Sequence, residues 1–90
     1  MIPMKELTLF YFDGCPHCAN AMRWQQELFL EHPEFKQVPL KLIDEHQQPA
    51  VADQYDYWLV PTYYLGGEKL YEGVMDKAQV AAAFQRALNS

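Results

Sequence analysis

Cys15-Pro16-His17-Cys18 places two thiols three positions apart, directly after an apolar run at residues 7–12. At the start of a helix, residues i and i+3 lie about 5 Å apart, within the Cα separation that a disulfide bond tolerates. A disulfide across so short a loop removes little entropy from the unfolded chain, so it is a poor structural crosslink. The spacing therefore predicts a redox-active dithiol that opens and closes with little movement of the backbone.

The composition of the chain excludes several classes of partner and location for this dithiol. The chain has 90 residues, half of them hydrophobic, which predicts a single domain over residues 1–90 with one modest core. A net charge of -5 without a Lys/Arg cluster argues against binding to nucleic acid or to an anionic membrane. Residues 1–6 lack a signal-peptide pattern, and no run approaches the roughly 20 apolar residues of a membrane span. We expect a soluble, cytoplasmic protein, and in that reducing compartment a close cysteine pair is catalytic or metal-binding rather than structural.

The first half of the chain reads as strand, helix and strand. Residues 6–12 are rich in aromatic and aliphatic side chains and predict a buried strand. Apolar residues on one stripe predict a helix over residues 16–32, which Pro33 ends. Residues 35–44 predict a second strand with Pro39 near its start. Two strands joined by a helix are expected to run parallel.

The second half adds a helix, a hairpin and a final helix. Residues 49–57 predict a short helix that begins with proline. Strands are predicted at residues 62–65 and 69–71, with a glycine-containing turn at residues 66–68 between them. After them, Asp76 and Gln79 form a capping-box pattern, followed by an apolar stripe at Val80, Ala83, Phe84, Ala87 and Leu88. The predicted element order is β-α-β-α-β-β-α.

This order resembles the thioredoxin-like superfamily over nearly the whole chain. The resemblance rests on Cys-x-x-Cys at the start of the first helix, Val60-Pro61-Thr62 at the start of the third strand, Gly73 after the fourth strand, and a terminal amphipathic helix. It implies an α/β, thioredoxin-like fold with a four-stranded mixed sheet flanked by helices. It also implies a small thiol–disulfide oxidoreductase of the glutaredoxin or thioredoxin type, which reduces or exchanges disulfides in protein or small-molecule partners.

The resemblance implies a catalytic role for each cysteine. Cys15 is expected to attack, because the N–H groups and macrodipole at a helix N-terminus stabilise a thiolate. Cys18, one turn further in, is expected to be buried and to resolve the mixed disulfide.

The pair between the cysteines, Pro16-His17, resembles that of bacterial periplasmic disulfide oxidants rather than the Gly-Pro of thioredoxins or the Pro-Tyr of glutaredoxins. A histidine there can donate to the Cys15 thiolate or place positive charge near it. We expect a potential less negative than the roughly -270 mV of thioredoxin. The alternative is that His17 is a solvent-exposed residue with a small effect.

A substrate-binding segment is predicted at Val60-Pro61. An ordinary X-Pro bond is cis only about 5–6% of the time, but the resemblance implies a cis Pro61 that faces the dithiol. It also implies that Val60 offers its backbone N–H and C=O to an extended peptide, a form of strand addition. Trp58, just before this segment, is predicted to line the peptide groove. For the remaining candidates, Tyr11, Tyr63 and Tyr64, burial in the core is the favoured interpretation.

Several residues depart from the family pattern. Thioredoxins carry a buried acid in the first strand, whereas residues 7–12 contain no carboxylate. Glutaredoxins place a basic residue before the first cysteine, whereas Asp13 stands there and would repel a glutathione carboxylate. Residues 73–76 match the glutathione cradle only in part. No bound cofactor is predicted, and glutathione is a candidate co-substrate, weakly held near Val60 and Asp76.

Alternatives from other classes remain open. Cys15 and Cys18 with His17, His32 or His46 could bind zinc, but a structural zinc site needs four ligands and the chain has no second Cys pair, so no metal is predicted. A non-catalytic thioredoxin-fold adaptor would bind partners without turnover, and an iron–sulfur cluster bridged with glutathione is disfavoured by Asp13. The expected partners are a disulfide-containing protein or a low-molecular-weight thiol, with a reductase or glutathione as electron donor, and the protein is expected to be a monomer.

Overall fold

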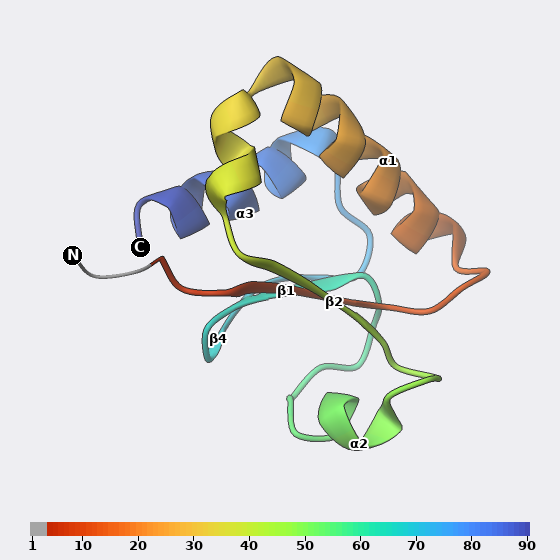
Figure 1. Ribbon diagram of the computed structural model, residues 1–90. Coiled ribbons are helices and arrows are strands. Elements are labelled where there is room, and N and C mark those ends of the chain that lie inside the picture. The colour runs from red at the N-terminus through yellow and green to blue at the C-terminus, as the bar shows by residue number, and fades with distance from the viewer. Residues whose placement is uncertain (1–3) are drawn as a thin grey trace.

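The computed structural model describes residues 4–90, which form a four-stranded sheet with α1 and α3 on one side and α2 on the other (Figure 1). Residues 1–3, part of the segment on which the signal-peptide prediction rests, lie outside the described residues. In residues 4–90, no helix is both long and apolar enough to cross a bilayer. The elements are β1 (Leu7–Tyr11), α1 (Pro16–Glu31), the 3-10 helix η1 (Pro33–Gln37), β2 (Leu40–Asp44), α2 (Pro49–Ala52), β3 (Thr62–Leu65), β4 (Glu68–Glu72) and α3 (Lys77–Leu88).

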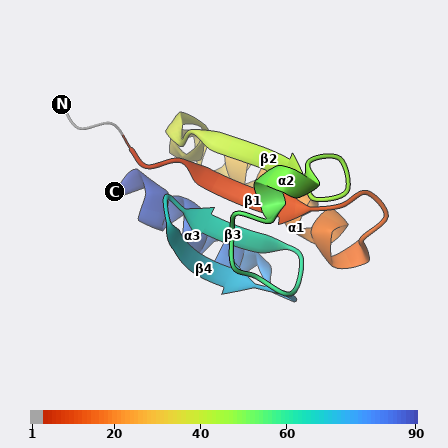
Figure 2. The same ribbon diagram turned by 90° about the horizontal axis from the view of Figure 1, so that it is seen from below.

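The strands lie in the order β2-β1-β3-β4, as Figure 2 shows from the side of α2. β1 and β2 pair in parallel, whereas β3 pairs antiparallel with both β1 and β4. The predicted mixed sheet and its parallel first pair are therefore confirmed.

Alternation along β1 and β3 divides the core into two clusters, because successive strand residues face opposite sides of a sheet. Leu9 and Tyr63 belong to the larger cluster, which includes buried residues of α1 and α3. Phe10 and Tyr64 belong to a smaller cluster with Ile43 and Ala52, on the side of α2.

The last helix begins as the sequence predicts. The Asp76 carboxylate accepts the Gln79 N–H at 2.8 Å, and the Gln79 side chain accepts the Asp76 N–H at 3.0 Å. This reciprocal capping box satisfies donors that a helix start otherwise leaves free. The apolar stripe that follows is buried at Val80, Ala83, Phe84 and Ala87.

The predicted second strand is wrong over residues 35–39. Pro33–Gln37 form the 3-10 helix η1, and the strand begins only at Leu40. Phe35 is buried and stacks on Phe84 with ring centroids 5.6 Å apart, which a continuous strand would not allow. Pro39 also lacks the N–H that a strand donates.

The short helix and the hairpin turn are also corrected. α2 ends at Ala52, and residues 53–57 are irregular because Tyr55 and Tyr57 turn their rings onto Phe10, at 4.7 and 4.8 Å between centroids. Glu68 pairs with Leu65, so it belongs to β4 and the turn is shorter than predicted.

Candidate active site

The dithiol and the predicted peptide-binding segment lie at the same end of the sheet. β1 and β3 are antiparallel with Phe10 opposite Thr62, so β1 ends where β3 begins. Residues 12–14 then lead from β1 into α1, while Val60-Pro61 directly precede β3. Figure 2 shows both connections at this edge of the sheet.

Cys15 occupies the N-cap of α1. Its backbone is extended, with φ -80° and ψ 114°, and its Sγ accepts the N–H of Cys18 at 3.2 Å. Pro16 follows at the first helical position, where its missing N–H costs nothing. The free N–H groups of the first turn and the helix macrodipole favour negative charge on the sulfur atom held here.

Cys18 is the more deeply buried cysteine, with 1% of its surface exposed against 7% for Cys15, and both are free thiols. Burial raises the pKa of Cys18 to about 12, aided by its hydrogen bond with Cys15 and by the charges of Cys15 and Glu45, while the Phe12 backbone acts in the opposite direction. Cys18 is therefore a protonated thiol at neutral pH.

Pro16 and His17 are exposed on the first turn of α1. The His17 side chain forms no hydrogen bond or ion pair with any of residues 4–90. The structure thus places His17 in solvent at the helix N-terminus, and its effect on the thiolate stays a prediction.

The Val60-Pro61 peptide bond is cis, as the resemblance implied. Pro61 is buried, and its C=O accepts the N–H of Gly73 at 2.8 Å. Gly73 has φ +85°, and a Cβ there would lie 3.1 Å from Leu59 Cδ1, so any other residue would be strained at this position. Neither backbone group of Val60 forms a backbone–backbone hydrogen bond within residues 4–90.

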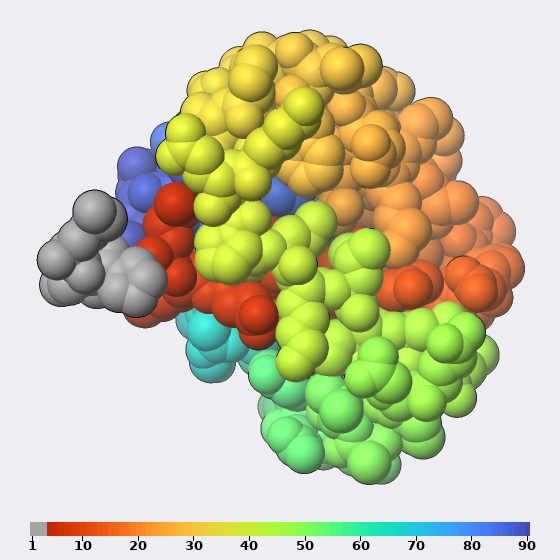
Figure 3. Space-filling model, in the orientation of Figure 1, coloured from red at the N-terminus to blue at the C-terminus, as the bar shows by residue number. Residues whose placement is uncertain are grey.

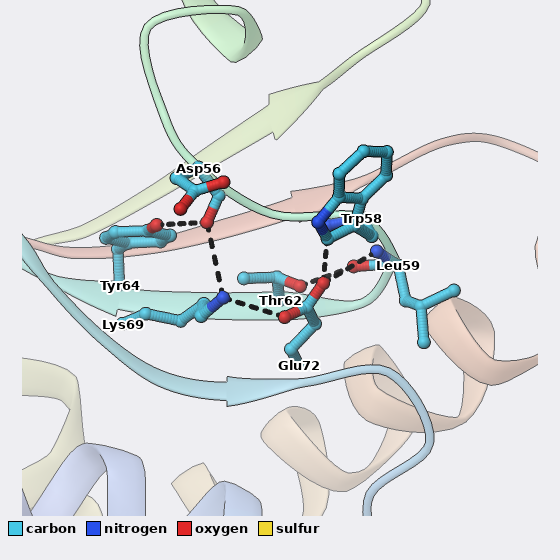
Figure 4. A network of polar contacts seen from close by, with 7 residues as sticks. All are labelled: Asp56, Trp58, Leu59, Thr62, Tyr64, Lys69 and Glu72. Carbon is cyan, nitrogen blue, oxygen red and sulfur yellow. Dashed lines mark hydrogen bonds and ion pairs between the residues drawn. The ribbon is translucent and has the colours of Figure 1, made fainter.

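Trp58 is 90% exposed, although its backbone is firmly held. One oxygen of the Glu72 carboxylate, Oε2, accepts the N–H groups of Trp58 and Leu59, the latter at 2.9 Å. The other oxygen, Oε1, lies 2.8 Å from Lys69 Nζ. Figure 4 shows this arrangement, with the indole ring directed away from the carboxylate. The ion pair with Lys69, followed by the two backbone N–H donors, lowers the pKa of Glu72 to about 2.

Further hydrogen bonds fix the same loop (Figure 4). The Tyr64 hydroxyl and Lys69 Nζ both donate to the C=O of Asp56, and the Thr62 hydroxyl donates to the C=O of Leu59. The loop over residues 56–59 is thus attached to both β3 and β4 through side chains. The backbone of Trp58 is therefore fixed three residues before the cis proline, although its side chain is exposed.

The other tyrosines considered for the groove are mainly core. Tyr63 and Tyr64 are buried, which confirms the favoured interpretation, and Tyr11 is half-buried. The Tyr63 hydroxyl accepts a hydrogen bond from Gln25, a buried polar residue of α1 that the apolar stripe did not indicate.

Two carboxylates of this region were not predicted. The Glu45 N–H donates to the C=O of Tyr11 at 2.8 Å, so Glu45 lies beside the end of β1, and its charge acts on Cys18. Parallel pairing of β2 with β1 is the signal that could have found it, since both strands end at the dithiol. Glu72 reaches the loop from β4, across a register irregularity between Tyr63 and Tyr64 that the sequence does not reveal.

The residues considered for metal or glutathione are dispersed. Within residues 4–90, no group of three or more His, Cys, Asp or Glu side chains could hold a metal ion. His32 lies near Glu34 after α1, and the His46 ring stacks on Phe12. Asp76 accepts the N–H of Gln79 as a helix cap, and Asp13 is exposed.

Comparison with known proteins gives one relative and several similar structures. No protein-family model matches the chain. A thioredoxin of Methanocaldococcus jannaschii is 29% identical over 83 residues, covering 92% of this chain and 95% of that protein. The thioredoxin of Fasciola hepatica superimposes with a TM-score of 0.70 at 18% identity, over 94% of this chain and 82% of its own. Mitochondrial thioredoxin 3 of Saccharomyces cerevisiae gives 0.66 at 19% identity, over 96% and 78%.

These similarities confirm the resemblance to the thioredoxin-like superfamily and the thioredoxin-like fold. Together with the spacing of Cys15 and Cys18, they support thiol–disulfide oxidoreductase chemistry in general.

Proposed function

We propose that this protein transfers two electrons from the Cys15/Cys18 dithiol to a disulfide in a protein or small-molecule partner. The observation that carries the proposal is the hydrogen bond from the Cys18 N–H to Cys15 Sγ at the N-cap of α1. It places one sulfur where a helix start stabilises a thiolate and the second sulfur one turn behind it.

The reaction proceeds in two exchanges. The Cys15 thiolate attacks one sulfur of the partner disulfide, forms a mixed disulfide, and releases the other partner sulfur as a thiolate that takes up a proton. Cys18 then loses its proton and attacks Cys15 Sγ, which releases the second partner thiol. Two electrons and two protons pass to the partner, and the protein is left with a Cys15–Cys18 disulfide.

The interactions of Cys18 fit this order. Its hydrogen bond with Cys15 and the charge of that sulfur are two of the causes that raise the pKa of Cys18. When Cys15 enters a mixed disulfide its sulfur is neutral, so the charge effect disappears and the hydrogen bond weakens, while burial, the largest cause, remains. The resolving thiol thus becomes easier to deprotonate at the step that needs its thiolate.

The segment before β3 supplies the binding surface in this proposal. Val60 has backbone groups free of backbone partners among the described residues, so an extended peptide can pair with it as an added strand. Trp58 offers an exposed aromatic face beside it, on a backbone held by Glu72. In this proposal the partners are disulfide-containing proteins or low-molecular-weight disulfides. A reductase or glutathione returns the dithiol to its reduced state. The protein acts as a monomer in the cytoplasm.

The Pro16-His17 pair is expected to set the redox potential of the dithiol. His17 lies exposed on the turn that carries Cys15, where its positive form would stabilise the reduced dithiol. A stabilised thiolate makes the disulfide a stronger oxidant, so we place the potential above roughly -270 mV. Such a protein exchanges disulfides as well as reducing them.

Trapping of the mixed disulfide tests the proposal. The Cys18→Ser variant, incubated with a peptide disulfide, should accumulate a covalent adduct at Cys15 that mass spectrometry detects and dithiothreitol removes. The matched Cys15→Ser variant should form little adduct, because Cys18 is buried and protonated. Equal adducts on both variants, or none on either, would refute the assigned roles.

A further inference from the structure

The side of the sheet covered by α2 contains a pocket that shares Trp58 with the proposed binding surface. Its volume is about 320 Å³. This is at the lower end of the roughly 300–1,000 Å³ range of ligand sites, so it suits one side chain rather than a folded partner. Figure 3 shows the α2 region (green) projecting below the rest of the molecule. The lining includes Glu45, His46, Asp53, Tyr55, Tyr57 and Trp58, which we call the acidic–aromatic pocket.

The charge of this pocket is negative. It is lined by two carboxylates, Glu45 and Asp53, and by no lysine or arginine. Glu45 Oε1 accepts the Tyr57 hydroxyl at 2.7 Å, while Oε2 lies 4.0 Å from His46 Nε2. The Asp53 carboxylate forms no hydrogen bond or ion pair with any of residues 4–90. Each carboxylate therefore retains acceptor capacity for a donor from outside the chain.

Aromatic rings supply the other walls. Tyr57 stacks on Phe10 with centroids 4.8 Å apart, which fixes its ring against the sheet. Burial, followed by the hydrogen bond with Glu45, raises the pKa of Tyr57, so its hydroxyl stays a hydrogen-bond donor to Glu45. Trp58 adds an exposed indole on a backbone anchored by Glu72. Aromatic faces beside carboxylates attract a cation in two ways, through the ring quadrupole and through charge.

The pocket adjoins the dithiol through one residue, Phe12. The His46 ring of the pocket stacks on Phe12 with centroids 4.5 Å apart, and the Phe12 C=O accepts the Cys15 N–H at 3.3 Å. On its other side, Trp58 stands two residues before Val60. A peptide bound along Val60 with its disulfide at Cys15 therefore passes close to the opening.

We propose that the acidic–aromatic pocket binds an arginine or lysine side chain of the peptide whose disulfide the Cys15 thiolate attacks. This inference rests on the proposed function and assigns it a substrate class, namely disulfides flanked by a basic residue. The electron transfer itself is unchanged.

Two peptide disulfides that differ in one charge provide the test. Each is a short peptide whose single cysteine is linked to thionitrobenzoate, with either arginine or its neutral isostere citrulline near the cysteine. The reduced wild-type protein should release thionitrobenzoate from the arginine peptide about fivefold faster, the preference expected of a cation–π contact with a partly screened ion pair. Added salt should reduce this preference.

Variants of the pocket test whether its carboxylates cause the preference for the arginine peptide. The ratio of the two rates should fall close to one in a Glu45→Gln/Asp53→Asn variant. It should persist in Glu34→Gln, because Glu34 is exposed on η1, an element that packs against α1 and α3. A symmetrical aromatic disulfide, dithiobis(nitrobenzoate), reports the dithiol chemistry separately.

If the wild-type protein reduces dithiobis(nitrobenzoate) but reacts with the two peptides at equal rates, the pocket assignment is wrong. It is also wrong if the Glu45→Gln/Asp53→Asn variant keeps the preference for the arginine peptide. If dithiobis(nitrobenzoate) reacts no faster with the wild type than with Cys15→Ser, the proposed function itself fails.

Discussion

The two faces of the sheet are built in different ways. The face covered by α1 and α3 is a continuous apolar cluster in which side chains of both helices meet β1 and β3. The face covered by α2 has a small aromatic cluster and a loop held by hydrogen bonds, among them those of Tyr64 and Glu72. The first arrangement concentrates the hydrophobic free energy of folding, and the second fixes the loop that carries Trp58, a residue of the proposed binding surface. We infer that stability and the proposed recognition of a partner depend on opposite faces of one sheet.

A cavity in the larger cluster should have the largest effect on stability. Phe84 is fully buried between Phe29, Phe35 and Tyr63. We expect Phe84→Ala to lower the free energy of unfolding by about 3–5 kcal/mol, measured by urea denaturation. Leu30→Ala, at a site that is 81% exposed, should change it by less than about 0.5 kcal/mol. A loss for Phe84→Ala below about 1 kcal/mol would show that the helices of this face do not carry the stability.

Removal of one hydroxyl from the face of α2 should have a smaller effect. Tyr64→Phe keeps the ring in its cluster but removes the hydrogen bond to the Asp56 C=O. We expect a loss of about 1 kcal/mol in the free energy of unfolding and a higher KM for a peptide disulfide, because the loop loses an attachment. Tyr71→Phe is the matched control, since the Tyr71 hydroxyl has no hydrogen bond within residues 4–90. Identical behaviour of the two variants would contradict the role of the bond.

The contribution of Glu72 to the free energy of unfolding should become measurable at acidic pH. Folding lowers the pKa of this carboxyl from its ordinary 4.5 to about 2, so the folded state binds fewer protons between these values. The stabilisation is present above the unfolded pKa and is lost as the pH falls through about 2. Wild-type unfolding should therefore depend more steeply on pH in this window than unfolding of Glu72→Gln. This is the smallest of the three effects, because the ion pair with Lys69 is exposed to solvent.

A control variant separates the specific contacts of Glu72 from a general loss of negative charge on β4. Glu68→Gln removes a carboxylate from the same strand, where it pairs with Arg86 instead of the loop. It should keep the wild-type pH dependence and the wild-type KM for a peptide disulfide. Parallel pH curves for wild type and Glu72→Gln would disprove the contribution of Glu72.

Local signals in the sequence predicted the dithiol, the hairpin and the last helix. Cys15 and Asp76 each cap a helix through a partner three residues away, and such contacts are visible in the sequence. The errors occurred where distant contacts decide the local structure, as with Phe35 against Phe84 and Tyr57 against Phe10. No spacing rule indicates these pairs.

The carboxylates of the site follow the same pattern. Glu45 acts on Cys18 only because β2 ends beside β1, and Glu72 reaches residues 58 and 59 only through the register of β4. The face of α2 thus depends on strand pairing, which explains why the sequence indicated Trp58 but not the residues that hold it.

The most direct test of the account is a redox titration of the purified protein in glutathione buffers, with free thiols alkylated and counted by mass. We predict one two-electron transition in which Cys15 and Cys18 change from two free thiols to none, at a potential less negative than roughly -270 mV. Cys18→Ser should show no such transition, because its Cys15 can form only a mixed disulfide with glutathione, which adds the mass of one glutathione. If the wild-type cysteines titrate independently, or fail to form a bond with each other, the central claim is contradicted.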